Sequence, residues 1–196
     1  MRKLDLRPGQ SVLDIGCGPG AVLQLREAVG AQGRVVGVDY SPRMLAKART
    51  QVDAHGWTDV ELREADASTD NLGRSEFDAA IALSSLSAMP DIRAAIEHAR
   101  DALRPDGRLF VFDLRLIHSG RVWQRAMTKL LRLAYRALAG FTGDDVPAEL
   151  QHTFATVVTV LPPERTKTMI TCVVATKRDD SSGPDTTQGT SAKDLS

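Results

Sequence analysis

The sequence lacks several features that would assign it to familiar classes of protein. Only two of its 196 residues are cysteines, Cys17 and Cys172, which excludes a disulfide scaffold and a metal site built from cysteine alone. No apolar run approaches the roughly 18 residues that span a bilayer. Residues 1–10 contain no apolar segment of a secretory signal. These absences favour a reducing, intracellular compartment, and we expect a cytoplasmic location.

The chain also lacks an excess of charge of either sign. Lys and Arg together number 25, as do Asp and Glu, so the formal net charge is zero. Dedicated nucleic-acid binders usually carry a basic excess, so we expect no nucleic-acid partner. The length suits one domain, which we expect to cover residues 1–177. The polar residues 178–196 are expected to form a disordered tail.

Short apolar runs alternate with helical patterns between residues 11 and 113. The pattern predicts strands at 11–15, 34–38, 60–65, 77–83 and 108–113, and helices at 21–29, from Pro42 to near Gly56, and at 92–103. Ser41 and Asp91 are typical caps for the second and third helices, and residues 104–107 read as a turn. Such alternation indicates an α/β fold with a doubly wound, mostly parallel sheet.

The alternation ends after Asp113. Residues 119–139 form one long helical pattern, within a helical insertion that we expect over residues 114–152 on the substrate side. Two β-rich runs follow at 153–161 and 168–177, joined by the short segment 162–165. A connection this short predicts an antiparallel hairpin.

The segment 12–20, Val-Leu-Asp-Ile-Gly-Cys-Gly-Pro-Gly, predicts a strand that runs into a glycine loop and then a helix. Glycine is needed where the backbone passes close to a ligand, and ligands of open α/β sheets bind beyond the carboxyl ends of the strands. Asp39 ends the second strand about 20 residues later. A carboxylate at this position can accept hydrogen bonds from both hydroxyls of a ribose. The glycine pattern alone also fits a dinucleotide site.

Three features favour a cationic sulfonium cofactor over a dinucleotide. Asp14 adds a negative charge that suits a sulfonium and an ammonium and opposes a pyrophosphate. Pro19 removes a backbone N–H that a phosphate would need. The chain also continues into a hairpin rather than further βαβ units.

With these residues the chain resembles the class I S-adenosylmethionine-dependent methyltransferases. The first motif of that family is matched by residues 14–20, and its acidic second-strand end by 37–41, followed by Met44. Asp66 and Ala67 match its acidic segment after the third strand, and residues 77–78 and 103–109 match its later motifs. The likeness covers residues 4–113 well and the hairpin loosely, and it is nearest to the small-molecule and ubiquinone or menaquinone biosynthesis group.

The resemblance implies a seven-stranded Rossmann-like sheet with an antiparallel last strand, and S-adenosylmethionine as cofactor. It places Asp39 on the ribose, Tyr40 beside the adenine, Asp66 near the adenine amino group and Ser84 at the methyl end. Other readings are that Asp39 caps a helix and that Asp66 is a solvated loop residue. The expected cofactor-binding residues are Asp14, Gly16, Cys17, Gly18, Gly20, Asp39, Tyr40, Asp66, Ala67 and Ser84.

The sequence offers few candidates for a general base, and no metal site is expected. Many related enzymes have a histidine after the fourth strand, but residues 84–91 contain none. Ser87 in this segment either orients a substrate or satisfies a backbone group. His118, just after the fifth strand, is the candidate base, although a lone histidine is more often structural. The weaker candidates are Asp113, Tyr135 and His152, and we expect His55 and His98 on exposed helix faces.

Five basic residues recur at helical spacing within 119–139: Arg121, Arg125, Lys129, Arg132 and Arg136. A basic amphipathic helix can contact an anionic membrane or an acidic substrate, or it can be a solvated face above the pocket. Only residues 1–10 precede the first strand, whereas relatives have one or two helices there. Three explanations remain open. The pocket is open, or this helix closes it, or the true start of the protein lies upstream of Met1.

We therefore expect an S-adenosylmethionine-dependent methyltransferase that acts on a small or amphipathic acceptor: a lipid, a quinone-like compound or a secondary metabolite. Two alternatives remain. A non-methylating protein would keep the fold as a partner subunit or scaffold. A nicotinamide oxidoreductase would share the glycine fingerprint and bind NAD. The sequence does not identify the acceptor or the oligomeric state.

Overall fold

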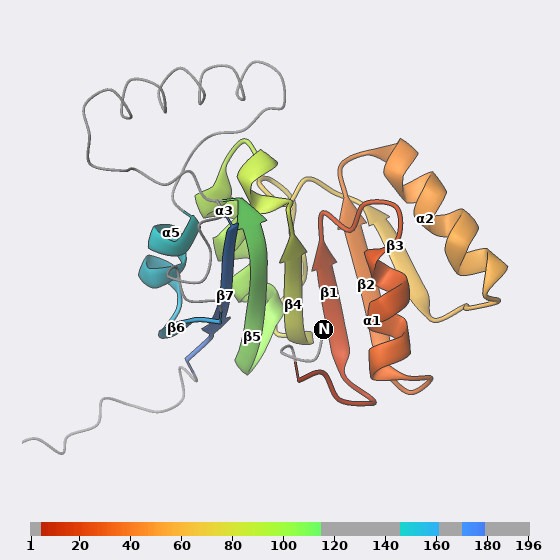
Figure 1. Ribbon diagram of the computed structural model, residues 1–196, viewed down its shortest axis with the longest axis horizontal. Helices are drawn as coiled ribbons and strands as arrows, with labels where there is room; N and C mark the ends of the chain where they lie inside the picture. The colour runs from red at the N-terminus through yellow and green to blue at the C-terminus, as the bar shows by residue number, and fades with distance from the viewer. Residues whose placement is uncertain (1–4, 115–145, 161–169, 179–196) are drawn as a thin grey trace, which may run out of the picture.

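The computed structural model describes residues 5–114, 146–160 and 170–178, and these residues form a single seven-stranded sheet flanked by helices (Figure 1). The strands are β1 (Ser11–Ile15), β2 (Arg34–Asp39), β3 (Val60–Glu64), β4 (Phe77–Leu83), β5 (Leu103–Leu114), β6 (Thr156–Thr159) and β7 (Ile170–Thr176). The helices are α1 (Ala21–Val29), α2 (Pro42–Ala54), α3 (Ile92–Ala102) and α5 (Val146–Thr153), with a 3₁₀ turn η1 (Leu86–Ala88).

The strand order is β3-β2-β1-β4-β5-β7-β6. Strands β1 to β5 pair in parallel, β7 pairs antiparallel with β5, and β6 pairs antiparallel with β7. The predicted doubly wound sheet with an antiparallel C-terminal strand is therefore confirmed. The chain leaves β1 toward β2 on one side and later returns to β4 on the other, so the strand order reverses between β1 and β4.

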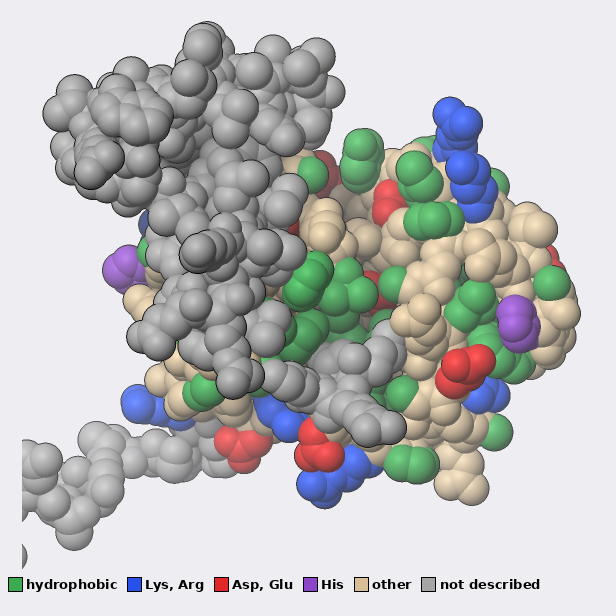
Figure 2. Space-filling model, in the orientation of Figure 1, with side chains coloured by type: hydrophobic (Ala, Val, Ile, Leu, Met, Phe, Trp, Pro, Cys, Tyr) green, Lys and Arg blue, Asp and Glu red, His purple; other side chains and the backbone are tan. Residues whose placement is uncertain are grey.

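The sheet divides the apolar core into two layers. Successive side chains of a strand point to opposite faces, so Leu13 and Ile15 pack with α3 and α5, whereas Val12 packs with α1 and α2. On the α1 side, Leu83, Phe110 and Val174 are only half-buried, and Figure 2 shows apolar side chains gathered near the centre of one face of the molecule.

The helix starts follow from the residues that precede them. The Ser41 hydroxyl accepts a hydrogen bond from the Met44 N–H, and Pro42 occupies the first turn of α2. The Asp91 carboxylate accepts one from the Ala94 N–H at 2.9 Å. Side chains of this kind satisfy backbone donors that a helix leaves unpaired at its start. Both predicted caps are therefore confirmed.

Several element boundaries differ from the prediction, most clearly at the starts of β5 and β6. Strand β5 already begins at Leu103, which pairs with Phe77, and the next pair joins Ala79 to Arg108. Residues 104–107 thus form an irregular, bulged part of the strand, in which Asp106 has a positive φ. Helix α5 extends through Thr153, so the first strand of the hairpin begins only at Thr156. The hairpin pairing itself is confirmed.

Several predictions fall outside the described residues. These are the basic helix 119–139 with His118 and Tyr135, the connection 162–165, and all but the first residue of the tail 178–196. Within the described ranges, no helix is long and apolar enough to cross a membrane.

Candidate functional site

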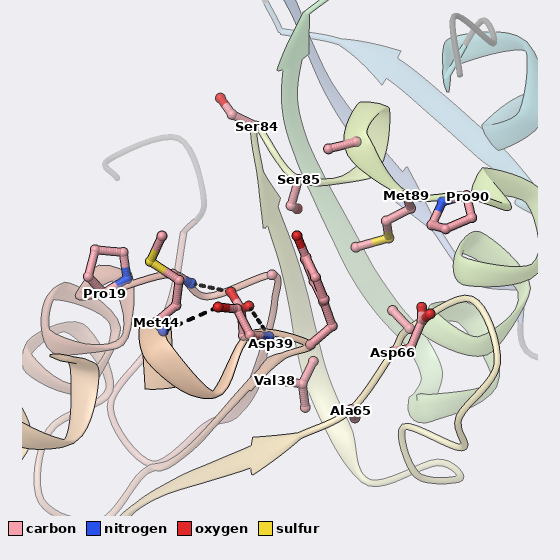
Figure 3. Close-up of a pocket in the computed structure, with 16 residues that line it drawn as sticks. Pro19, Val38, Asp39, Met44, Ala65, Asp66, Ser84, Ser85, Met89 and Pro90 are labelled. Carbon is pink, nitrogen blue, oxygen red and sulfur yellow. Dashed lines mark hydrogen bonds between the residues drawn. The ribbon is translucent and has the colours of Figure 1, made fainter. Parts of the chain in front are cut away.

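A pocket of about 440 Å³ lies beyond the carboxyl ends of the parallel strands, where the strand order reverses (Figure 3). Four segments surround it: the glycine loop after β1, the junction of β2 with α2, the loop after β3, and the turn after β4. The lining residues are Gly16, Gly18, Pro19, 38–41, Met44, 65–67, Ser84, Ser85 and 88–90. Open α/β sheets bind their ligands at this position.

Asp39 links two of these segments. Its Oδ2 accepts a hydrogen bond from the Gly18 N–H and its Oδ1 accepts one from the Ser41 N–H, both at 2.9 Å (Figure 3). Only 7% of Asp39 is exposed. The carboxylate is therefore fixed in orientation at the pocket wall, although each oxygen can accept a further hydrogen bond. Tyr40, the next residue, is 78% exposed at the rim of the pocket.

The glycine loop needs glycine for two different reasons. Gly16 has φ +68°, and a Cβ there would lie 2.4 Å from the Cβ of Ser85, because the turn after β4 passes directly over it. Gly18 has φ +56° and nothing within 4 Å of its Cβ position, so its backbone borders open space in the pocket. From α2, the Gln51 side chain donates a hydrogen bond to the Pro19 carbonyl at 2.7 Å.

Asp14 lies on β1 directly before the glycine loop and is completely buried. Neither carboxylate oxygen has a hydrogen-bond partner among the described residues. Burial, and secondarily the nearby Asp39 charge, raise the pKa of Asp14 to about 7. A buried carboxylate without partners is costly to keep ionised, so this position is unlike an ordinary core residue.

The loop after β3 is shaped by its own acidic side chain. Asp66 accepts a hydrogen bond from the Ser68 N–H at 2.8 Å, and its own N–H donates to Asp70. The ring of His98 on α3 is hydrogen-bonded through Nδ1 to the Ala67 carbonyl at 2.8 Å. His98 is half-buried, so the prediction of an exposed, solvated His98 was wrong: it packs α3 against this loop. His55 is exposed as predicted.

The turn after β4 forms the opposite wall of the pocket. Ser84 is exposed at its start and has φ +53°, which is unusual for a residue with a side chain. Ser85 donates a hydrogen bond to the Ile15 carbonyl at 2.7 Å. Met89 and Pro90 contribute apolar surface facing Asp66 (Figure 3).

Seven of the ten predicted cofactor residues line this pocket: Gly16, Gly18, Asp39, Tyr40, Asp66, Ala67 and Ser84. The other three do not. Asp14 and Cys17 are buried beneath the loop, and a Cβ at Gly20 would face the Gln51 side chain. Burial raises the pKa of the Cys17 thiol to about 12, with the Asp14 and Asp39 charges adding to the shift, so this thiol stays protonated.

The prediction missed the apolar wall of residues 88–90. Nothing in that short segment suggests ligand contact, although the cap at Asp91 fixes where the chain enters α3. Met44 matches a family motif in the sequence but has no predicted role, and the structure shows that it lines the pocket.

The structure shows where two of the candidate general bases lie. Asp113 is buried and does not line the pocket; its carboxylate accepts two hydrogen bonds from Ser87. His152 is exposed in the last turn of α5. His118 and Tyr135 lie outside the described residues. Within the described ranges, no group of three or more His, Cys, Asp and Glu side chains is arranged to hold a metal ion.

Comparison with known proteins identifies the family of this site. A family profile described as a methyltransferase domain matches residues 12–107. An uncharacterized transposon protein of Streptomyces fradiae is 42% identical over 107 residues, or 54% of this chain and 30% of that protein. Nocamycin O-methyltransferase of Saccharothrix syringae is 36% identical over 107 residues, 54% and 38% of the two chains. Demethylmenaquinone methyltransferase of Shouchella clausii is 34% identical over 114 residues, which are 58% of this chain and 48% of that protein.

Solved structures share the fold at low sequence identity. The YcgJ protein of Bacillus subtilis has a TM-score of 0.71 at 16% identity, covering 91% of this chain and 96% of that one. A SAM-dependent methyltransferase of Aquifex aeolicus has a TM-score of 0.64 at 18% identity, and the match covers 89% of this chain and 85% of that one.

The chain spans less than half the length of these curated relatives. The family match falls on the segment that carries the glycine loop, Asp39, Asp66 and the turn after β4, which are the segments that line the pocket. S-adenosylmethionine is the cofactor of this family, as the motifs predicted. Over residues 12–107 the chain thus carries a methyltransferase domain of the class I S-adenosylmethionine-dependent family.

Proposed function

We propose that this protein transfers a methyl group from S-adenosylmethionine to a small or amphipathic acceptor, such as a quinone-like phenol or a related secondary metabolite. One observation carries the proposal: the Asp39 carboxylate is buried and fixed by the Gly18 and Ser41 backbone at the wall of a pocket beside the glycine loop. The names of two relatives, nocamycin O-methyltransferase and demethylmenaquinone methyltransferase, support an acceptor of this class.

The pocket residues fit the nucleoside part of this cofactor. Each Asp39 oxygen accepts one backbone N–H and retains capacity for a second donor, which suits the two ribose hydroxyls. The exposed Tyr40 ring at the rim offers a flat apolar surface for the adenine. Asp66, on the facing loop, is an acceptor suited to the adenine amino group.

Asp14 fits the cationic part of the cofactor. When bound, S-adenosylmethionine supplies a methyl group on a positively charged sulfonium and also carries an ammonium group. A positive charge beside the glycine loop would favour the ionised form of the unpaired Asp14 carboxylate beneath it. Because Asp14 does not line the pocket, its negative charge would act on the ligand by long-range electrostatic attraction rather than by direct contact.

The described part of the pocket favours an acceptor that needs little help to lose a proton. Its titratable lining residues are Asp39, Tyr40 and Asp66, and we assign all three to the cofactor. An acidic phenol or enol can react when it is held in line with the methyl group, so positioning supplies most of the catalysis. Met89 and Pro90 provide an apolar wall for such an acceptor. His118 stays the predicted base.

The test is turnover with a panel of quinols, phenols and lipids, followed by mass spectrometric detection of S-adenosylhomocysteine. We expect product with at least one phenolic acceptor from the wild type. We expect none from Asp39→Ala and an unchanged rate from Asp53→Ala, which alters an exposed carboxylate on α2. Cofactor binding without turnover on any acceptor would contradict the proposal and support the non-methylating alternative.

The predicted membrane contact through residues 119–139 is a separate proposal that rests on the sequence alone. It is tested by sedimentation with vesicles that contain anionic lipid. Binding that disappears at high salt supports it, and equal recovery with neutral vesicles contradicts it.

A further inference from the structure

The turn after β4 needs an anchor, because it forms one wall of the pocket and has little regular structure of its own. Within η1 and its flanks, the Ala88 N–H donates to the Ser85 carbonyl and the Met89 N–H to the Leu86 carbonyl. A single 3₁₀ turn with two such hydrogen bonds is weakly stable by itself. Contacts with the rest of the molecule must therefore fix its position.

The polar contact in the middle of the turn joins Ser87 to Asp113 near the end of β5. The Ser87 N–H donates to Asp113 Oδ2 at 2.9 Å, and the Ser87 hydroxyl donates to Asp113 Oδ1 at 2.5 Å. Both residues are buried, Asp113 with only 1% of its surface exposed. Hydrogen bonds to an ionised acceptor are shorter and stronger than neutral ones, so this carboxylate holds the middle of the turn.

Two further hydrogen bonds attach the beginning of the turn to the sheet. The Ser84 N–H donates to the Phe112 carbonyl at 2.7 Å, and the Ser85 hydroxyl donates to the Ile15 carbonyl at 2.7 Å. These act before η1. Within η1, Leu86 is fully buried in the core and Ser87 is hydrogen-bonded to Asp113, so the segment that carries Ala88 and Met89 is held through these two residues.

We propose that Asp113 is a positioning residue that holds the turn after β4, through Ser87, in the place where Ala88 and Met89 line the cofactor pocket. It is not a general base: both of its oxygens accept hydrogen bonds from Ser87, and it does not line the pocket. The inference rests on the proposed function only in so far as that pocket binds S-adenosylmethionine.

Three variants separate the contributions. Asp113→Ala removes both acceptors, and Ser87→Ala removes the hydroxyl and leaves the N–H donor. Asp113→Asn is the conservative variant, because its amide oxygen can still accept from the Ser87 N–H while its NH₂ donates to the Ser87 hydroxyl oxygen. Asp53→Ala on the exposed face of α2 is the matched control for removing a carboxylate.

The first readout is amide hydrogen exchange over residues 84–90 in the protein without cofactor. We expect exchange there to become about 10- to 100-fold faster in Asp113→Ala, from the loss of hydrogen bonds to a charged group, with a smaller rise in Ser87→Ala. Exchange in β1 and β2 should not change. Asp113→Asn keeps both hydrogen bonds but loses the charge, so its exchange should lie closer to the wild type than to Asp113→Ala. Adding Ser87→Ala to Asp113→Ala should have little further effect.

The second readout is the dissociation constant of S-adenosylhomocysteine, which should rise about tenfold in Asp113→Ala and by clearly less in Asp113→Asn. If the wild type binds no S-adenosylhomocysteine, the proposed function fails, but the exchange measurement still tests the role of Asp113. If Asp113→Ala does not fold, Ser87→Ala carries the test. Unchanged exchange over 84–90, or an equal increase throughout the sheet, would overturn the inference.

Discussion

Asp14 is the residue whose surroundings differ most from those of an ordinary carboxylate. It is fully buried, lacks hydrogen-bond partners among the described residues, and has a pKa of about 7, raised by burial and by Asp39. The folded state therefore binds the Asp14 proton more tightly than the unfolded state does. The free energy of unfolding must fall as pH rises from about 4 to about 7 through this one group, so Asp14 destabilises the fold at neutral pH.

Replacing Asp14 by Asn should consequently stabilise the protein while weakening its proposed function. At pH 8 we expect the free energy of unfolding to exceed that of the wild type by roughly 2–4 kcal/mol, and at pH 4 the difference should largely disappear. Urea denaturation across this pH range measures it. The same variant should bind S-adenosylmethionine more weakly, because a negative charge beneath the ligand is lost. A constant difference in stability at every pH would contradict this account of Asp14.

Gly16 combines a positive φ with a close approach of the turn after β4, so its substitution should be costly. Gly16→Ala places a Cβ 2.4 Å from the Cβ of Ser85 at a φ of +68°, so we expect a loss of about 2–4 kcal/mol from strain and overpacking. Gly56→Ala is the matched control, because Gly56 has φ +66° with nothing within 4 Å; it should lose only about 1 kcal/mol. Chemical denaturation compares them, and equal losses would show that the turn after β4 does not press on Gly16.

At the scale of single elements, local signals in the sequence are sufficient to predict the start of a helix where a capping side chain precedes it. Ser41 with Pro42 marks the start of α2, and Asp91 marks the start of α3, because the hydroxyl or carboxylate satisfies a backbone donor three residues later. Helix α5 also has an aspartate directly before it and a proline in its first turn, but it is only eight residues long and buries only Val146 and Leu150. Its position depends on packing against α3 and β7, which a local pattern does not contain.

The cap of α3 provides a test at this scale. Asp91→Ala removes the acceptor for the Ala94 N–H, and we expect a loss of about 1 kcal/mol in the free energy of unfolding. Asp91→Asn keeps an oxygen at the same place and should lose much less. Thermal and denaturant unfolding of the two variants measure this. A loss from Asp91→Asn as large as that from Asp91→Ala would show that the charge, rather than the hydrogen bond, stabilises the start of α3.

At the scale of the whole molecule, parallel topology explains why much of the candidate site could be predicted. Asp39, Asp66 and Ser84 follow three different strands, and the carboxyl ends of parallel strands meet at one edge of the sheet. Contacts between distant segments could not be predicted in this way. The sequence offers Ser87 as a substrate contact and Asp113 as a weak candidate base, and only the packed fold shows that the two residues are hydrogen-bonded to each other.

The most direct test of the proposed function is a calorimetric titration with S-adenosylmethionine, S-adenosylhomocysteine and NAD on the wild type, Asp39→Ala and Asp53→Ala. Asp39 anchors the glycine loop and faces the pocket, whereas Asp53 is exposed on α2. We expect micromolar binding of the first two ligands, no binding of NAD, loss of binding in Asp39→Ala and retention in Asp53→Ala. Binding of NAD in preference to S-adenosylmethionine, or undiminished binding by Asp39→Ala, would contradict the account.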